Sequence, residues 1–230
     1  MKDPYLYDDV TVLINKLNIK ENTKLDEYEN RMTTLAIISI YKDEVVIESS
    51  MDIFEIHKRL FSDVYEWAGK HRIINIQKQE PILNGLSVIY SEHSKIISEL
   101  KRVDKVYFGL SWNKLSKFDF IHCFTRMISE IWQIHAFREG NTRSVSTLAF
   151  LFLKQYGYTY DAYLIKENAK YFRNALVMAS IGEYSEYEHL QEILMDAISN
   201  KKVINQKQKY SKIKDYNVND YKYDYHKLKK

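Results

Sequence analysis

The segment HAFREGNTR, residues 135–143, places a proton acceptor, a turn and a cation within nine residues. His135 is its one side chain that exchanges a proton near neutral pH. Gly140-Asn141 suits a turn, and a helix that begins there would point free backbone N–H groups at an anion. Arg143, in the first turn of that helix, adds a guanidinium suited to phosphate oxygens. The segment therefore predicts an anion-binding site beside a base.

Glu139 lies next to this anion site, where its carboxylate would repel a phosphate. A divalent cation such as Mg²⁺, bridging Glu139 and the phosphate oxygens, would remove the repulsion. A base, a metal ligand, an anion-binding turn and an arginine together indicate phosphoryl or nucleotidyl transfer. A buried histidine at a helix end and an ordinary Gly-Asn turn explain the same residues without any chemistry. The spacing alone leaves both interpretations open.

Apolar residues at helical spacing flank this segment and predict a helix on each side of it, the second ending at Gly157. Further helices are expected over 25–45, 53–68, 92–102, 166–180 and 184–199. Asp52 and Glu55 would form a capping box at the start of the helix over 53–68, and Gly69 would end it. With 2 Pro and 6 Gly in 230 residues, few positions break helices, which favours a mostly helical protein.

One segment differs from these helices. Residues 73–76 and 88–90 are rich in β-branched and aromatic residues, and Pro81 and Asn84-Gly85 lie between them. This pattern predicts a short β-hairpin, in a loop or flap rather than in the helical core.

Charge and apolar content limit the compartment and the partners. No apolar run reaches the roughly 18 residues of a membrane-spanning helix, and one cysteine, Cys123, excludes an internal disulfide framework. We expect a soluble, cytoplasmic protein, although export without a cleaved signal stays open. Residues 201–230 carry 10 Lys and 3 Asp, hence +7, which leaves −4 for the remainder of a chain of net charge +3. This is not the pattern of a uniformly basic nucleic-acid binder, so we expect neither a nucleic-acid nor a membrane partner.

The motif and its surroundings resemble the Fic/Doc family, whose usual signature is His-Pro-Phe-x-Asp/Glu-Gly-Asn-Gly-Arg-x-x-Arg. Residues 56–76 are similar to the family helix that leads into its hairpin flap, and 84–91 to the second flap strand. Residues 5–19 resemble its N-terminal segment, and 171–184 the helix that closes its nucleotide site. The resemblance spans about 5–199 in the family's order. It implies an all-α Fic fold, a helical bundle with a short β-hairpin flap near the active site. Residues 1–200 would form this domain, and 201–230 a Lys/Tyr-rich tail, helical or disordered.

Most members of this family transfer AMP from ATP to a protein hydroxyl with the help of Mg²⁺. The resemblance implies that His135 is the general base and that Glu139 holds Mg²⁺. The remaining motif residues would bind the nucleotide: Arg138, pointing outward and acting through backbone geometry, Gly140, Asn141, Thr142 and Arg143. Phe172, Arg173 and Ser180 would contact the adenosine. Phe137 would hold the loop in the core.

The flap, residues 76–90, would bind an extended segment of a target protein by strand addition. Ile82 and Leu83, followed by Asn84 and Gly85 at the turn, would contact that target.

Three motif positions depart from the family pattern: Ala136 replaces Pro, Thr142 replaces Gly, and Ser146 replaces the second Arg. Thr142 could narrow the pocket or contribute a hydroxyl at the helix start. A donor other than ATP, such as UTP or CDP-choline, is therefore an alternative. A catalytically weak, protein-binding Fic domain is another, and a nucleic-acid binder that uses the basic tail is a third.

The inhibitory motif of the family, Ser/Thr-x-x-x-Glu-Gly/Asn, is absent; TKLDEY and LDEYEN, within residues 23–30, are near matches. In the family the inhibitory Glu pairs with the second Arg, which is Ser146 here, so an inhibitory Glu would lack a partner. A separate antitoxin-like chain is the expected inhibitor, if one exists. The tail tyrosines 210, 216, 221, 223 and 225 are candidate sites of self-modification.

Overall fold

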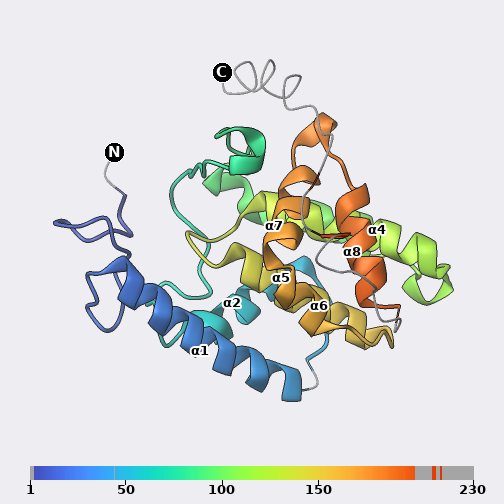
Figure 1. Ribbon diagram of the computed structural model, residues 1–230, viewed down its shortest axis with the longest axis horizontal. Coiled ribbons are helices and arrows are strands. Elements are labelled where there is room, and N and C mark those ends of the chain that lie inside the picture. The colour runs from blue at the N-terminus through green and yellow to red at the C-terminus, as the bar shows by residue number, and fades with distance from the viewer. Residues whose placement is uncertain (1–2, 44, 200–208, 211–212, 214–230) are drawn as a thin grey trace.

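The computed structural model describes residues 3–43, 45–199, 209–210 and 213. Eight α-helices make up about half of this part of the chain, and short helical turns add to them (Figure 1). They are α1 (Asn22–Lys42), α2 (Ile53–Phe61), α3 (Ile96–Val103), α4 (Lys117–Ile134), α5 (Asn141–Gln155), α6 (Ala162–Glu167), α7 (Ala169–Met178) and α8 (Glu188–Ala197). Short 3₁₀ turns lie at Ser50–Asp52, Pro81–Leu83, His93–Lys95, Trp112–Lys114 and Gly182–Tyr184, and a π-helical turn at Asp104–Phe108. The mostly helical fold is confirmed.

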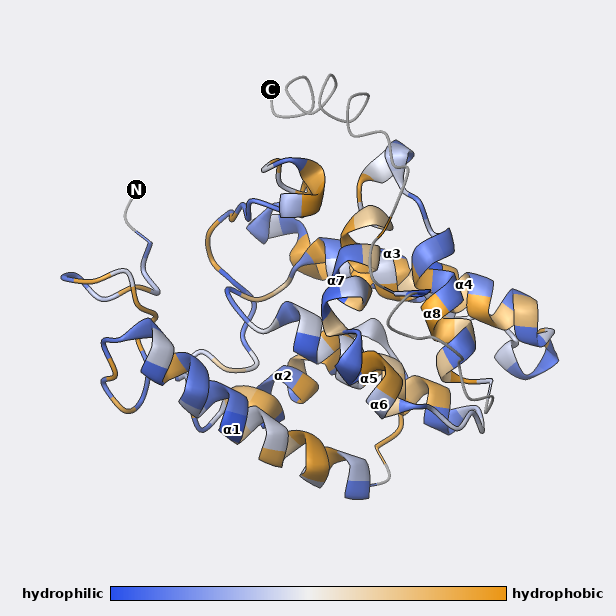
Figure 2. Cartoon of the chain, in the orientation of Figure 1, coloured by the Kyte–Doolittle hydropathy of each residue, from blue (hydrophilic) through white to orange (hydrophobic). Residues whose placement is uncertain are grey.

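Helix α4 is the centre of the bundle and packs against α3, α5, α7 and α8. Its apolar side chains are buried, among them Phe124, Ile128 and Trp132. Helix α2 lies between α1 and α5, so α1 covers one edge of the molecule (Figure 1). Apolar and polar residues alternate along the helices, as expected when each turns one face to the core (Figure 2). No helix in the described residues is long and apolar enough to cross a membrane.

The predicted helices around the motif are confirmed, and two other predictions need correction. The helix over 53–68 ends earlier, at Phe61, and its capping box uses Ser49 with Asp52 rather than Asp52 with Glu55. The helix over 166–180 is two helices, because the side chain of Asn168 donates to the carbonyl of Leu164, 2.8 Å away, and ends α6.

The predicted β-hairpin is not confirmed. Within the described residues the one β-bridge joins Leu6 to Leu13, outside the flap. The flap instead has two extended arms around the turn Pro81–Leu83, tied by the backbone hydrogen bond from the Glu80 N–H to the Leu86 carbonyl at 2.9 Å. Asn84 (φ 52°) and Gly85 (φ 87°) form its tip in the left-handed region.

Most of the tail, 201–230, lies outside the described residues, including Tyr216, Tyr221, Tyr223 and Tyr225. Tyr210 and Ile213 are buried, and the Tyr210 hydroxyl donates to Asp196 on α8. Lys209 also pairs with α8, through Glu192 at 3.0 Å. Tyr210 is therefore a poor candidate for self-modification.

Candidate active site

His135 is the C-cap that directly follows α4, and it adopts a left-handed conformation with φ 51°. Its ring lies against Tyr90, with the ring centroids 3.9 Å apart. Nδ1 is 3.2 Å from the Trp132 carbonyl, which can only accept, so Nδ1 carries the proton. Nε2 is buried and has no hydrogen-bond partner in the part of the chain that the structure describes. An unshared lone pair in a buried site is what a general base needs.

Burial holds the pKa of His135 well below its ordinary value, and the positive charges of Lys78, Arg72 and Arg173 lower it further. The imidazole is therefore neutral at pH 7 and able to accept a proton at Nε2.

The turn after His135 is closed by the side chain of Asn141. Its Oδ1 accepts from the Phe137 N–H at 2.9 Å, and its Nδ2 donates to the Phe137 carbonyl at 2.8 Å. Gly140 has φ 81°, and a Cβ there would lie 2.3 Å from the Phe61 ring, so this position requires glycine. The turn feeds directly into α5, whose first N–H groups have no partner within the helix. The predicted anion-binding geometry is thus present, while the Asn141 side chain holds the loop rather than facing a ligand.

Each charged residue of the motif is paired with a residue from the first half of the chain. Arg138 binds Asp3 through Nε at 2.9 Å and Nη2 at 2.8 Å. Its side chain is 19% exposed, which corrects the expectation that it points outward. Arg143 pairs with Glu29 of α1. Glu29 is buried and also accepts from the Tyr65 hydroxyl. The expectation that an inhibitory glutamate within residues 23–30 would lack a partner is therefore wrong, because Glu29 pairs with Arg143.

Glu139 is bound at both carboxylate oxygens. Oε1 accepts from the Gly140 N–H at 3.0 Å, and Oε2 lies 3.0 Å from the Lys78 ammonium of the flap. Burial raises the pKa of Glu139, but Lys78 and the Gly140 N–H outweigh it, so the pKa is lowered and the carboxylate is charged. The described residues contain no cluster of three metal-binding side chains. One charged carboxylate that already attracts a cation suits Mg²⁺, which takes few protein ligands and completes its shell with phosphate oxygens.

Two important residues were missed in the sequence. Arg72 is fully buried, and every partner of its guanidinium is a carbonyl: His135 at 2.8 Å, Ile74 at 2.7 Å, Ile134 at 3.4 Å and Ser91. Burial lowers the pKa of Arg72 to about 10. Since Ile134 ends α4 and Ile74 and Ser91 flank the flap, Arg72 connects the loop of residues 135–143 to the base of the flap.

His57 of α2 is the second missed residue. Its Nε2 donates to the Glu139 carbonyl at 3.1 Å, and its Nδ1 accepts from the Gly69 N–H at 2.9 Å. Its ring stacks on Phe137 with centroids 3.7 Å apart. Burial lowers the pKa of His57 to about 3. The sequence contained a signal for this residue. His57 lies one turn into the helix predicted over 53–68, and the glycine assigned to the end of that helix, Gly69, is the residue that donates to His57.

Thr142 lies at the start of α5, where its hydroxyl accepts from the indole N–H of Trp132 at 3.0 Å. Trp132 also accepts from His135 through its carbonyl, so Thr142 is joined to His135 through one residue. Ser146 lies one turn further along α5 and is half-buried.

Some residues of the flap lie in the hydrophobic core, and others lie at the exposed tip of the flap. Ile82 and Leu83 are buried in the hydrophobic core, which contradicts the expectation that they face a target. Asn84 and Gly85 are exposed at the tip. Glu80 is fully buried and forms two bonds, at 2.6 and 2.9 Å, with Arg173 of α7. Arg173 thereby anchors the flap.

Phe172 and Ser180 are the other two residues that were expected to contact adenosine. Phe172 is buried, and the buried Ser180 hydroxyl donates to the Ser129 carbonyl at 3.1 Å. Ser180 also lines a cavity of about 260 Å³ with Ile89, Gln133 and residues 181–184. Adenosine binding by these residues stays a prediction.

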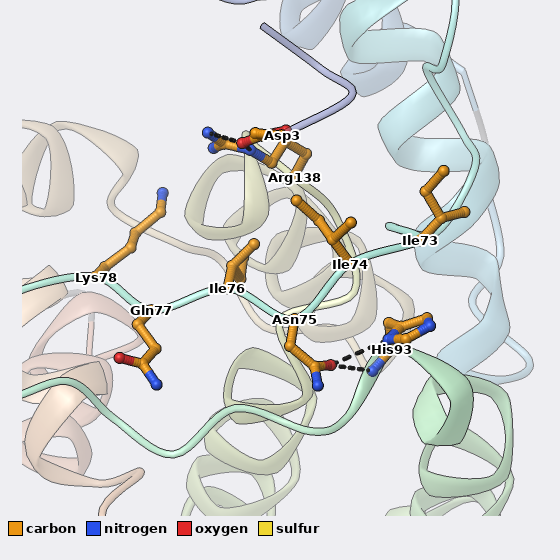
Figure 3. A pocket seen from close by; sticks show the side chains of 9 residues that line it. All are labelled: Asp3, Ile73, Ile74, Asn75, Ile76, Gln77, Lys78, His93 and Arg138. Carbon is orange, nitrogen blue, oxygen red and sulfur yellow. Dashed lines mark hydrogen bonds and ion pairs between the residues drawn. The ribbon is translucent and has the colours of Figure 1, made fainter. Parts of the chain in front are cut away.

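A larger cavity, of about 520 Å³, lies along the first flap arm and is called the flap cavity here (Figure 3). Residues 73–78 form one wall, and Asp3, His93 and Arg138 complete it. Lys78 lies at one end of this wall, and the Asp3–Arg138 pair faces it (Figure 3). The flap cavity therefore adjoins the motif.

The sequence pattern of the Fic/DOC family matches residues 48–153. A probable protein adenylyltransferase, y4lH of Sinorhizobium fredii, is 30% identical over 80% of this chain and 91% of its own length. The chain belongs to the Fic/DOC family. The adenylyltransferase VbhT of Bartonella schoenbuchensis is 28% identical over 84% of this chain, which spans 38% of VbhT. Among solved structures, BepC of Bartonella tribocorum with bound AMPPNP matches this Fic fold with a TM-score of 0.72 and 22% identity, over 86% of this chain and 97% of that one.

Proposed function

We propose that this Fic-family protein transfers AMP from ATP to a Tyr, Ser or Thr hydroxyl of a target protein. The observation that carries the proposal is the buried Nε2 of His135, which has no hydrogen-bond partner among the described residues, in the same loop that leads into the N–H groups at the start of α5. The names of VbhT and y4lH, both adenylyltransferases, support the same reaction.

In this reaction the target hydroxyl gives its proton to Nε2 of His135 while its oxygen attacks the α-phosphorus of ATP. The bond from that phosphorus to the bridging oxygen breaks, and pyrophosphate leaves. The N–H groups at the start of α5 and the guanidinium of Arg143 stabilise the negative charge on the phosphates. Mg²⁺, when bound, adds positive charge at the phosphate oxygens, and Glu139 is the residue that would hold it.

The test is to incubate the protein with a cell lysate and α-³²P-labelled ATP, GTP, CTP or UTP. We expect label from ATP on target proteins. His135→Ala should lose it by at least about 100-fold, the usual contribution of a general base. His122→Ala, a half-buried histidine on the same helix, is the matched control. Transfer from UTP or CTP in place of ATP would show that the donor is another nucleotide, and equal labelling by the two histidine variants would refute the proposed base.

The partners follow from this function. The target protein would bind along the flap cavity, and a separate inhibitor chain stays a prediction that copurification can test. Several similar structures are described as VirB-translocated effectors of Bartonella, so export is an alternative to the cytoplasm for this protein as well. Cell fractionation would decide between them.

A further inference from the structure

Lys78 is the one residue of the flap cavity wall that pairs with the proposed metal ligand. Its ammonium lies 3.0 Å from Oε2 of Glu139, and its side chain is 27% exposed. Lys78 lies outside the motif of residues 135–143, in the first arm of the flap. Lys78 therefore needs an explanation of its own.

Hydrogen bonds hold the backbone around Lys78, whereas its side chain ends in the ion pair with Glu139. The Lys78 N–H donates to the Ser87 hydroxyl on the other flap arm at 3.2 Å. Two residues later, the buried Glu80 is clamped by Arg173. Lysine carries its charge on a flexible four-carbon chain with three rotatable donors. The ammonium can thus leave Glu139 without any movement of the flap.

The ammonium occupies the position that a metal ion would need. Oε1 of Glu139 is bound to the Gly140 N–H within the turn, and Oε2 is bound to Lys78. A divalent cation that coordinates Oε2 must therefore displace the ammonium, since two cations cannot share one carboxylate oxygen without strong repulsion. Lysine and metal compete for the same oxygen.

The displaced ammonium would remain at the reaction centre. The ammonium lies 3.0 Å from Oε2 of Glu139, four residues after His135 in the same loop, and after burial its charge is the largest cause of the lowered pKa of His135. Arg173 and Arg72 contribute less to this effect. Lys78 also lies at one end of the flap cavity wall (Figure 3). Between a base and a metal ligand, an ammonium faces the phosphate that is being transferred.

We propose that Lys78 is a further catalytic residue, which neutralises Glu139 in the free protein and contacts the α-phosphate oxygens once a divalent cation has taken Glu139. This inference rests on the proposed AMP transfer. As the target oxygen bonds to the α-phosphorus and pyrophosphate leaves, the negative charge on the non-bridging oxygens rises. The ammonium stabilises that charge. The target proton still goes to His135.

The experiment compares Lys78→Met, which keeps the length of the chain but has no charge, with the wild-type protein. Lys70→Met is the matched control, because Lys70 is an exposed lysine shortly before the flap. Two quantities are measured: the affinity of the nucleotide-free protein for Mn²⁺, by electron paramagnetic resonance, and the single-turnover rate of AMP transfer at saturating Mg²⁺ and ATP. Glu139→Gln shows which Mn²⁺ binding depends on the carboxylate.

We expect the two quantities to change in opposite directions. Lys78→Met should bind Mn²⁺ about 3- to 10-fold more tightly, because its competitor is gone, and should transfer AMP about 100-fold more slowly. Lys70→Met should change neither. General damage to the fold would weaken both, which circular dichroism would detect as well.

Unchanged or weaker Mn²⁺ binding by a folded Lys78→Met would overturn the competition, and an unchanged transfer rate would overturn the catalytic role. If the wild-type protein transfers no nucleotide, the proposed function fails and the catalytic role fails with it, but the Mn²⁺ titration still decides the competition. If the wild-type protein and Lys70→Met transfer AMP and Lys78→Met does so equally well, only the inference on Lys78 is wrong.

Discussion

The loop of residues 135–143 has two sides that are held in different ways. On the inner side, buried residues bind its backbone: Arg72 binds the His135 carbonyl, His57 the Glu139 carbonyl, and Asn141 both polar groups of Phe137. On the outer side, the charged side chains of the loop form ion pairs: Arg138 with Asp3, Glu139 with Lys78, and Arg143 with Glu29.

This difference separates shape from ligand binding. Buried hydrogen bonds to backbone groups cannot be exchanged for water or ligand without a large penalty, so the inner side fixes the conformation of the loop. The outer pairs hold side chains that a nucleotide, a metal ion or a target would also need. Each of those pairs can give way to a ligand of the same charge as the present partner. The loop is thus rigid where its geometry matters and exchangeable where it binds.

The largest effect is expected from breaking the inner side at Arg72. Arg72→Met leaves the carbonyls of Ile74, Ser91, Ile134 and His135 without this donor, and each buried, unpaired acceptor costs about 1–3 kcal/mol. Since the buried charge is also removed, we expect a net loss of roughly 3–5 kcal/mol in the free energy of unfolding. Urea denaturation would measure it.

Arg138→Met is the matched change on the outer side. Its guanidinium is part-exposed and bound to a single acid, Asp3, so the loss should stay below about 1 kcal/mol. Equal losses for the two arginines would mean that the two sides do not differ in this way.

The second effect is a dependence of stability on pH that comes from the inner histidines. The folded-state pKa values of His57, about 3, and His135, well below 6.5, lie under the unfolded value near 6.5. The unfolded chain therefore binds more protons than the folded one below pH 6.5, so stability is complete above that pH and falls below it. Between pH 6 and 5 His57 should contribute a loss that approaches about 1.4 kcal/mol per pH unit, and His135 adds a loss of the same sign.

His57→Phe keeps a ring to stack on Phe137 and removes one of these two groups. The slope of unfolding free energy against pH between pH 6 and 5, measured by urea denaturation at several pH values, should fall by about 1.4 kcal/mol per pH unit. A slope that His57→Phe leaves unchanged would contradict the assignment to buried histidines.

The sequence predicted the parts of this site that depend on local order. The helical spacing of Phe124, Ile128 and Trp132 correctly predicted α4, and Gly140-Asn141 correctly predicted the turn before α5. These features follow from periodicity and turn chemistry within a few residues.

The sequence could not reveal features that depend on distant segments. Arg72 lies 63 positions from His135, and nothing in its own neighbourhood shows that it will be buried against α4. The hairpin prediction for the flap was not confirmed for a similar reason. The β-prone residues of 73–90 favoured a hairpin, but contact with α7 through Arg173 and the burial of Ile82 and Leu83 took the place of strand pairing. Tertiary contacts overruled local preference here.

The third effect sharpens the comparison on the outer side, where a ligand should replace an existing pair. Glu29→Gln removes the negative charge that holds Arg143, and the amide can still accept from the Tyr65 hydroxyl. If Arg143 binds a phosphate as proposed, α,β-methylene ATP should bind about tenfold more tightly, or about 1.4 kcal/mol. Isothermal titration would measure this affinity.

Asp26→Asn is the control, because Asp26 is an exposed acid on the same helix. It should leave the affinity within about twofold. A similar gain from both variants would point to the general charge of α1 rather than to the Glu29–Arg143 pair.

The smallest effect concerns Thr142, which joins the two sides because it starts α5 and accepts from the buried indole of Trp132. Thr142→Val keeps the shape of the side chain but removes the acceptor, so the indole N–H loses its partner and the protein about 1 kcal/mol of stability. Thr142→Ser keeps the hydroxyl and should lose less. Urea denaturation with tryptophan emission would measure both losses.

In a Trp132→Phe background the indole N–H is already absent, so Thr142→Val should cost clearly less stability there than in the wild-type protein. An equal cost in both backgrounds would mean that Thr142 acts through its contact with the start of α5 and not through Trp132.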